Sequence, residues 1–113
     1  MDAESPELLP MPKLVVERSR FWPKLRREHL KKERYCQVCG TSKFLVPHHI
    51  KPVHLFPELE LKADNLITLC ESPGFWCHLL FGHLGCFRSY NPQVVSDVRL
   101  WHNKILNRCY RAI

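Results

Sequence analysis

Two pairs of cysteines restrict the fold of this 113-residue chain more than any other feature of its sequence. Cys36 and Cys39 form a C-x2-C pair followed directly by Gly40, and Cys70 and Cys77 form a second pair later in the chain. Four thiolates from two such turns make the closed tetrahedral site that is typical of structural zinc. The spacing therefore predicts a structural Zn²⁺ that joins two distant parts of the chain.

The second pair leaves alternatives open, because the six residues "ESPGFW" separate its cysteines where two are typical. His78 could replace Cys77 as the fourth ligand, or the cysteines could be buried thiols, which is what we expect of Cys86 and Cys109 at helical positions. A structural zinc contributes on the order of 10 kcal/mol to folding, which matters for a core this small.

The composition fits a folded protein that stays inside the cell. Hydrophobic residues make up 45% of the chain and charged residues 25%, which are ordinary values. The chain contains no run of about 20 apolar residues for a membrane span, and its acidic, proline-containing start is unlike a secretory signal. We expect a cytoplasmic protein without a membrane partner, in which cysteines serve as ligands or free thiols.

Basic charge is concentrated near the N-terminus. Of the net charge of +6, residues 17–34 carry +5, from eight Lys or Arg residues and three Glu residues. Such a stripe is typical of a protein that binds a phosphate backbone, although a solvated helix face is the equally ordinary alternative.

The periodicity divides the chain into a flexible N-terminal tail (residues 1–16) and a single domain (residues 17–113). Within the domain we expect a basic helix at about 19–34, a central region at about 35–90 with a strand at 65–70, and a C-terminal helix at about 92–110. Asn91 and Pro92 can start this last helix. Its predicted core stripe is Val94, Val98, Trp101, Ile105 and Cys109.

Two neighbouring histidines, His48 and His49, lie between Pro47 and Pro52 in the stretch "VPHHIKP". Adjacent side chains of a strand point to opposite faces, so the pair could serve one site only if the backbone turns there, as the prolines suggest. An isolated pair of this kind is more often a surface loop.

The segments "CQVCG", "HHIKP", "DNLITLC" and "CHLLFGH", in this order, resemble the HNH endonucleases of the zinc-containing type over about residues 20–95. The resemblance implies an α+β fold with a ββα-metal (His-Me finger) core, in which a two-stranded antiparallel hairpin packs on a helix. Flanking helices and the four-cysteine zinc site complete this fold.

The resemblance also implies roles for individual residues. His48 and His78 take the positions of ligands to a catalytic divalent cation, His49 that of the general base, and Asn65 that of a residue that orients His49 or pins its loop. His83 is a further candidate ligand, but it follows His78 by five residues, and a regular helix rotates it well away unless Gly82 lets the helix deform.

The implied activity is metal-dependent hydrolysis of DNA phosphodiester bonds. His49 would activate water, and the cation would stabilise the phosphate and the leaving oxygen. Among Mn²⁺, Mg²⁺ and Ni²⁺, imidazole ligands favour Mn²⁺ or Ni²⁺ over the harder Mg²⁺. The residues expected to contact the DNA backbone are Arg20, Lys24, Arg26, Arg27, Lys31, Lys51 and Arg88.

Two other classes of function remain as alternatives. A non-catalytic zinc-ribbon module that binds nucleic acid would account for the basic stripe and the cysteines, but not for the histidines and Asn65 at nuclease positions. A structural zinc domain that binds protein through Phe75 and Trp76 would leave the basic stripe without a role. A homodimer would help so small a domain to cut both strands, but the sequence leaves this open.

Overall fold

The computed structural model describes residues 18–111, and side chains as far as Asn107. The expected tail at residues 1–16 and the side chain of Cys109 lie outside this part. The chain forms α1 (Trp22–Lys32), β1 (Leu45–His49), β2 (Leu66–Cys70), a helical turn η4 (His78–Gly82) and α2 (Val94–Arg111), with short 3-10 turns η2 (Pro57–Leu59) and η3 (Ala63–Asn65) between the strands. The fold is thus α+β, with a two-stranded antiparallel sheet, as expected.

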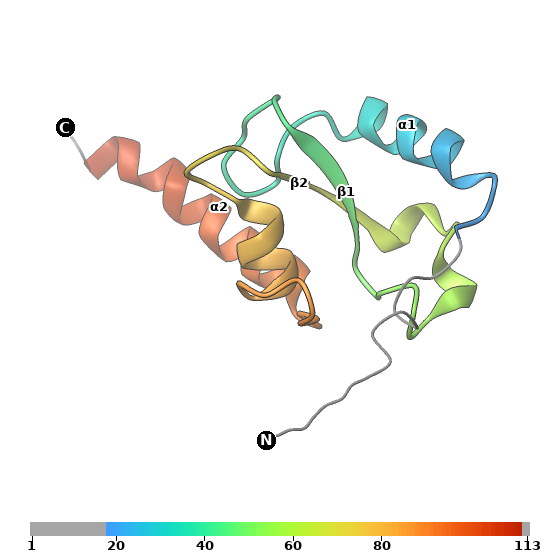
Figure 1. Ribbon diagram of the computed structural model, residues 1–113. Coiled ribbons are helices and arrows are strands. Elements are labelled where there is room, and N and C mark those ends of the chain that lie inside the picture. The colour runs from blue at the N-terminus through green and yellow to red at the C-terminus, as the bar shows by residue number, and fades with distance from the viewer. Residues whose placement is uncertain (1–17, 112–113) are drawn as a thin grey trace, which may run out of the picture.

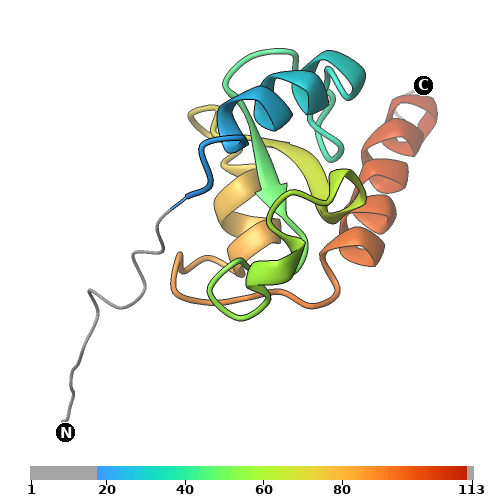
Figure 2. The same ribbon diagram turned by 90° about the vertical axis from the view of Figure 1, so that its right-hand side faces the viewer.

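The sheet lies at the centre of the molecule, with α1 on one side and η4 and α2 on the other (Figures 1 and 2). In its register His48 pairs with Ile67, and His49 pairs with Leu66. Every residue of β2 is buried. This burial fits the mainly apolar sequence "LITLC", whose one polar member, Thr68, donates its hydroxyl to the Glu33 carbonyl at 2.9 Å.

The helices fall within a few residues of their expected bounds. α1 begins three residues after the expected start, with Pro23 in its first turn. Just before α2 the buried Asn91 accepts a hydrogen bond from the Gln93 N–H at 3.0 Å, although the helix begins at Val94, two residues after the expected start. None of the helices in residues 18–111 is long and apolar enough to cross a membrane.

The predicted core stripe of α2 is only partly correct. Val94 and Val98 are buried in the core, but Trp101 is 46% exposed. In Figure 1 the C-terminal half of α2 runs beyond the sheet. Trp101 packs against Phe81 of η4 with ring centroids 6.0 Å apart, and Ile105 is partly buried against the core.

The sulfur atoms of Cys36, Cys39, Cys70 and Cys77 all lie within 4.8 Å of one another. Cys39 Sγ and Cys70 Sγ are 3.7 Å apart, and a zinc tetrahedron with Zn–S bonds of about 2.3 Å has edges of roughly 3.8 Å. The alternative ligand His78 lies instead beside two other histidines. The donor set and its geometry therefore fit a closed metal site.

The ionisation of these thiols also favours a cation. A hydrogen bond from Cys77 lowers the pKa of Cys36 to about 5. The same hydrogen bond, followed by burial, raises the pKa of Cys77, and burial raises the pKa of Cys39 to about 11. Without a metal one thiolate forms at the expense of its neighbours, whereas a divalent cation would stabilise four together.

The expectation that Cys86 is a buried thiol is wrong. Its side chain is exposed, because η4 ends at Gly82 and the chain turns through Leu84 and Gly85, both with positive φ. Cys86 therefore lies in a surface turn, where it provides a control for the clustered cysteines.

We predict that Cys36→Ser loses bound zinc and thermal stability together, because one oxygen replaces a ligand of a site that holds three segments of the chain. Zinc content by mass spectrometry and the melting temperature check this, with Cys86→Ser as the control that keeps both. A Cys36→Ser protein with full zinc content and an unchanged melting temperature would contradict the assignment.

Candidate metal and catalytic site

Three histidines from separate segments converge on the side of the sheet that η4 covers. His48 comes from β1, His78 begins η4, and His83 follows η4. The distance from His78 Nε2 is 3.1 Å to His48 Nδ1 and 3.2 Å to His83 Nε2. One ring nitrogen of each histidine thus lies within 4.8 Å of the other two.

The position of His83 depends on the form of η4, which is a π-helical turn rather than an α-helical one. The i to i+5 pattern of a π-helix places residues five apart on the same face, so His83 lies beside His78. The rotation of His83 away from His78 that a regular helix would give does not occur, because the π-helical form extends over the whole turn His78–Gly82.

Gly82 also sets how closely η4 approaches β1. A Cβ at this position would lie 3.0 Å from both Cε1 and Nδ1 of His48. Real Cβ atoms make such close contacts very rarely, so glycine is the residue that permits this approach.

Hydrogen bonds at the outer nitrogens orient two of the rings. His78 Nδ1 lies 2.9 Å from Glu71 Oε2, and His83 Nδ1 lies 2.9 Å from the carbonyl oxygen of Ser89. Because both oxygens are acceptors, each Nδ1 donates a proton. With Nδ1 as the donor, Nε2 of each ring is the nitrogen that can bind a metal, and the two Nε2 atoms lie 3.2 Å apart.

Three ring nitrogens that converge within 4.8 Å of one another fit the ligand set of a divalent metal. Burial, then the neighbouring His78 and His83, lowers the pKa of His48 to about 3. Burial also lowers the pKa of His83. Both rings are thus neutral near pH 7, which is the state that ligates a metal.

His49 points to the other face of the sheet. Its ring packs on Trp22 with centroids 4.7 Å apart, and its Nε2 lies 3.1 Å from the carbonyl oxygen of Glu60. Because that oxygen can only accept, Nε2 donates and Nδ1 carries the lone pair. Burial lowers the pKa of His49, so the ring is neutral near pH 7.

Although they alternate across the strand, both histidines line one cavity of about 190 Å³. β1 ends at His49 and the chain bends directly afterwards, so both rings reach the same opening. A shared site therefore arises at the end of the strand. The cavity is also lined by Arg18, Pro47, Pro52, Val53, His78 and His83.

Asn65 is buried and bonds to the loop that follows His49. Its Oδ1 accepts the Lys51 N–H at 2.9 Å, and its Nδ2 donates to the Lys51 carbonyl at 3.0 Å and to the Leu59 carbonyl at 3.3 Å. These bonds go to the backbone rather than to the His49 ring. Of the two expected roles, the geometry therefore fits pinning the loop.

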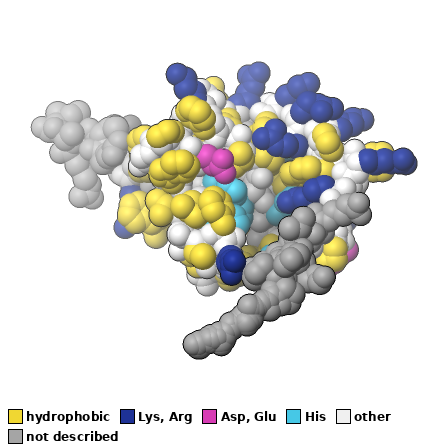
Figure 3. Space-filling model, in the orientation of Figure 1, with side chains coloured by type: hydrophobic (Ala, Val, Ile, Leu, Met, Phe, Trp, Pro, Cys, Tyr) yellow, Lys and Arg dark blue, Asp and Glu magenta, His cyan; other side chains and the backbone are white. Residues whose placement is uncertain are grey.

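Lys and Arg side chains gather over α1, beside the hollow in which histidines are visible (Figure 3). Of the residues expected to contact DNA, Arg26 is half-buried and the others are exposed: Arg20, Lys24, Arg27, Lys31, Lys51 and Arg88. They lie at the surface, where a phosphate backbone can reach them.

Four residues of the site were not found from the sequence. Arg18 lines the histidine cavity, and its guanidinium lies 5.2 Å from the centre of the Trp22 ring, which in turn packs on His49. Glu71 and Ser89 orient the other rings. The position of Glu71 directly after Cys70 is a usable signal, but no spacing marks Arg18, Trp22 or Ser89.

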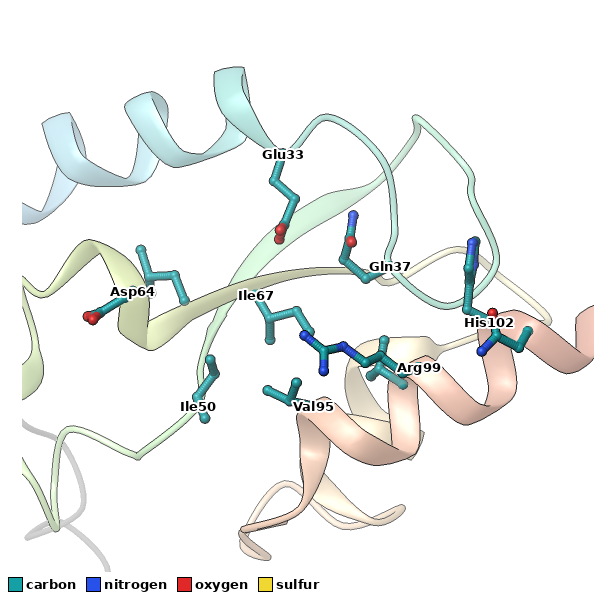
Figure 4. A pocket seen from close by; sticks show the side chains of 11 residues that line it. Glu33, Gln37, Ile50, Asp64, Ile67, Val95, Arg99 and His102 are labelled. Carbon is teal, nitrogen blue, oxygen red and sulfur yellow. The ribbon is translucent and has the colours of Figure 1, made fainter. Parts of the chain in front are cut away.

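A larger cavity of about 520 Å³ lies between α2 and the sheet, away from the converging histidines (Figure 4). Its walls include Ile67, Val95 and Arg99. The carboxylate of Glu33, also in this wall, accepts the Thr68 N–H at 2.7 Å and thereby joins α1 to β2. Size alone is a poor guide here, because the converging histidines line the smaller cavity.

Comparison with known proteins identifies the central segment. Residues 36–79 match the family model described as HNH endonuclease. The match includes the four clustered cysteines and His48, His49, Asn65 and His78, and ends before His83. Searches of the curated proteins and of the solved structures found no match. By its sequence and by the residues it brings together, the segment 36–79 of this chain is similar to the HNH endonucleases.

Proposed function

We propose that this protein is a metal-dependent endonuclease that hydrolyses DNA phosphodiester bonds on a ββα-metal core formed by β1, β2 and η4. One observation carries the proposal. A cluster of three imidazoles that fits a cation shares a cavity with a fourth imidazole, His49, whose Nδ1 is free to accept a proton.

His48, His78 and His83 would hold a divalent cation, which when bound would neutralise phosphate charge and stabilise the leaving oxygen. The all-nitrogen donor set favours Mn²⁺ or Ni²⁺ over Mg²⁺. Glu71 and Ser89 would hold the ligand rings in place, as outer partners of metal-binding histidines do.

His49 would take the proton from the attacking water at Nδ1. The Glu60 carbonyl fixes the required tautomer, and Trp22 holds the ring from one side. The lowered pKa of His49 keeps the ring unprotonated and able to act as a base near neutral pH. Asn65 acts on the same ring indirectly, by pinning the loop at Lys51.

The basic surface would hold the phosphate backbone. Exposed side chains of α1, together with Lys51 and Arg88, supply affinity that falls with salt rather than a choice of sequence. Arg18 would contribute closest to the cleavage site, because it lines the cavity that contains His49.

We predict that the protein nicks supercoiled plasmid in Mn²⁺ and that His49→Ala lowers the rate roughly 10²- to 10⁴-fold, the usual contribution of a general base. Gel analysis of the nicked form over time checks this. His102→Ala, on α2 and outside the histidine cavity, is the control that keeps full activity. Zinc content verifies that each variant is folded.

Two outcomes would count against the proposal. If neither parent nor variant nicks DNA while salt-dependent binding persists, the protein is a non-catalytic zinc-ribbon module. If His49→Ala nicks as fast as the parent, His49 is not the base.

We predict that Gly82→Ala weakens Mn²⁺ binding at the histidines at least tenfold and leaves the zinc content unchanged. The added Cβ would meet the His48 ring at 3.0 Å and displace it. Alanine stabilises a helix by about 1 kcal/mol relative to glycine, so a weaker helix cannot cause the loss.

Mn²⁺ titration followed by electron paramagnetic resonance measures this affinity. Leu80→Ala, at an exposed position of the same turn, is the matched control. An unchanged affinity in Gly82→Ala would show that the His48 ring is not a ligand in the position described.

A further inference from the structure

The histidine cavity continues into a second hollow of about 150 Å³, which we call the aromatic lobe. Both hollows are lined by His48, His49, Pro52 and His83, so they are adjoining parts of one cleft. The residues that line only the second hollow are His54, Phe87, Arg88, Ser89 and Tyr90. A molecule that places a phosphate at the histidines would therefore place the part next to that phosphate in the aromatic lobe.

Phe87 is the most exposed apolar side chain of the lobe. Its ring packs against His83 and His78, with centroids 5.1 and 5.7 Å apart, yet 57% of the residue remains exposed. The ring is thus supported from one side and open on the other. Arg88 adds a positive charge beside it, and Tyr90 adds a second aromatic ring.

The wall of the lobe is held in place at both ends. The Ser89 carbonyl accepts the proton of His83 Nδ1, and the Ser89 N–H donates to the Cys86 carbonyl at 2.7 Å. The buried Asn91 donates to the Phe81 carbonyl at 2.8 Å. A ligand would therefore meet a preformed surface and would not have to order a loop on binding.

We propose that the aromatic lobe binds the nucleobase adjacent to the phosphate held at the histidines, so that the substrate is a strand whose base at the cut is unpaired or leaves the duplex stack on binding. This inference rests on the proposed nuclease function and names its substrate class. Bases stack on aromatic side chains beside a basic groove with little regard to sequence. A base inside a duplex cannot reach such a surface unless it leaves the stack.

The test asks whether the effect of removing one base from the substrate depends on the presence of the Phe87 ring. Single-stranded oligonucleotides that carry one abasic nucleotide at successive positions are cleaved in Mn²⁺, and cleavage is measured at every linkage. For the parent we expect cleavage at the linkage beside the abasic position to fall on the order of tenfold. Phe87→Ala should cut more slowly and show no further loss at that linkage.

Phe75→Ala is the matched control, because Phe75 is also 57% exposed but lines neither hollow. It should behave as the parent does. Phe87→Trp, which keeps a stacking ring against the ligand histidines, should restore the sensitivity to the abasic position.

A second readout requires no cleavage. An oligonucleotide containing 2-aminopurine, mixed with protein in buffer without added divalent cation, should lose fluorescence on binding to the parent and to Phe75→Ala, and much less on binding to Phe87→Ala. Cleavage that is indifferent to the abasic position, with equal quenching by all three proteins, would overturn the base site and leave the nuclease intact. If no cleavage occurs at all, the proposed function is overturned. The fluorescence loss of 2-aminopurine would still show whether a base binds in the aromatic lobe.

Discussion

The mutual approach of four cysteine thiols is the interaction on which the rest of this small fold depends. Cys36 and Cys39 lie in the turn before β1, Cys70 ends β2, and Cys77 directly precedes η4. The cluster thus fixes the point at which η4 leaves the sheet. Because His78 is the next residue, the same cluster fixes the distance between His78 and His48. A structural metal here would determine the geometry of the second site as well as the stability of the fold.

The histidine site combines two backbone geometries that place side chains in different ways. Strand alternation sends His48 towards η4 and His49 towards α1, which separates the ring proposed to bind a metal from the ring with a free Nδ1. The π-helical turn brings His78 and His83 to one side, and Gly82 lets this turn lie against the His48 ring. The adjacent residues His48 and His49 thus lie in different environments, whereas His78 and His83, five residues apart, lie in the same one.

Much of this arrangement could be predicted from the sequence, because cysteine spacing and the order of short motifs are local signals. They indicated the α+β fold with its antiparallel strands and the cysteine cluster. His83 could be named only as a candidate ligand, since its position beside His78 depends on a π-helical turn that departs from regular helical periodicity. The burial of Trp101 and Cys86 was wrongly predicted, because Trp101 packs on Phe81 at the surface of α2, and the chain leaves the helical turn before Cys86. Arg18 and Trp22 reach the site only through the packing of α1 on the sheet, which leaves no mark in residue spacing.

The most direct test of this account is the anomalous diffraction of crystals of the protein grown with Mn²⁺. The account predicts two separate metals, one zinc among the four cysteines and one manganese within bonding distance of His48 Nδ1, His78 Nε2 and His83 Nε2. A manganese peak that His83 does not contact, or the absence of a peak between the three rings when zinc occupies the cysteines, would contradict it.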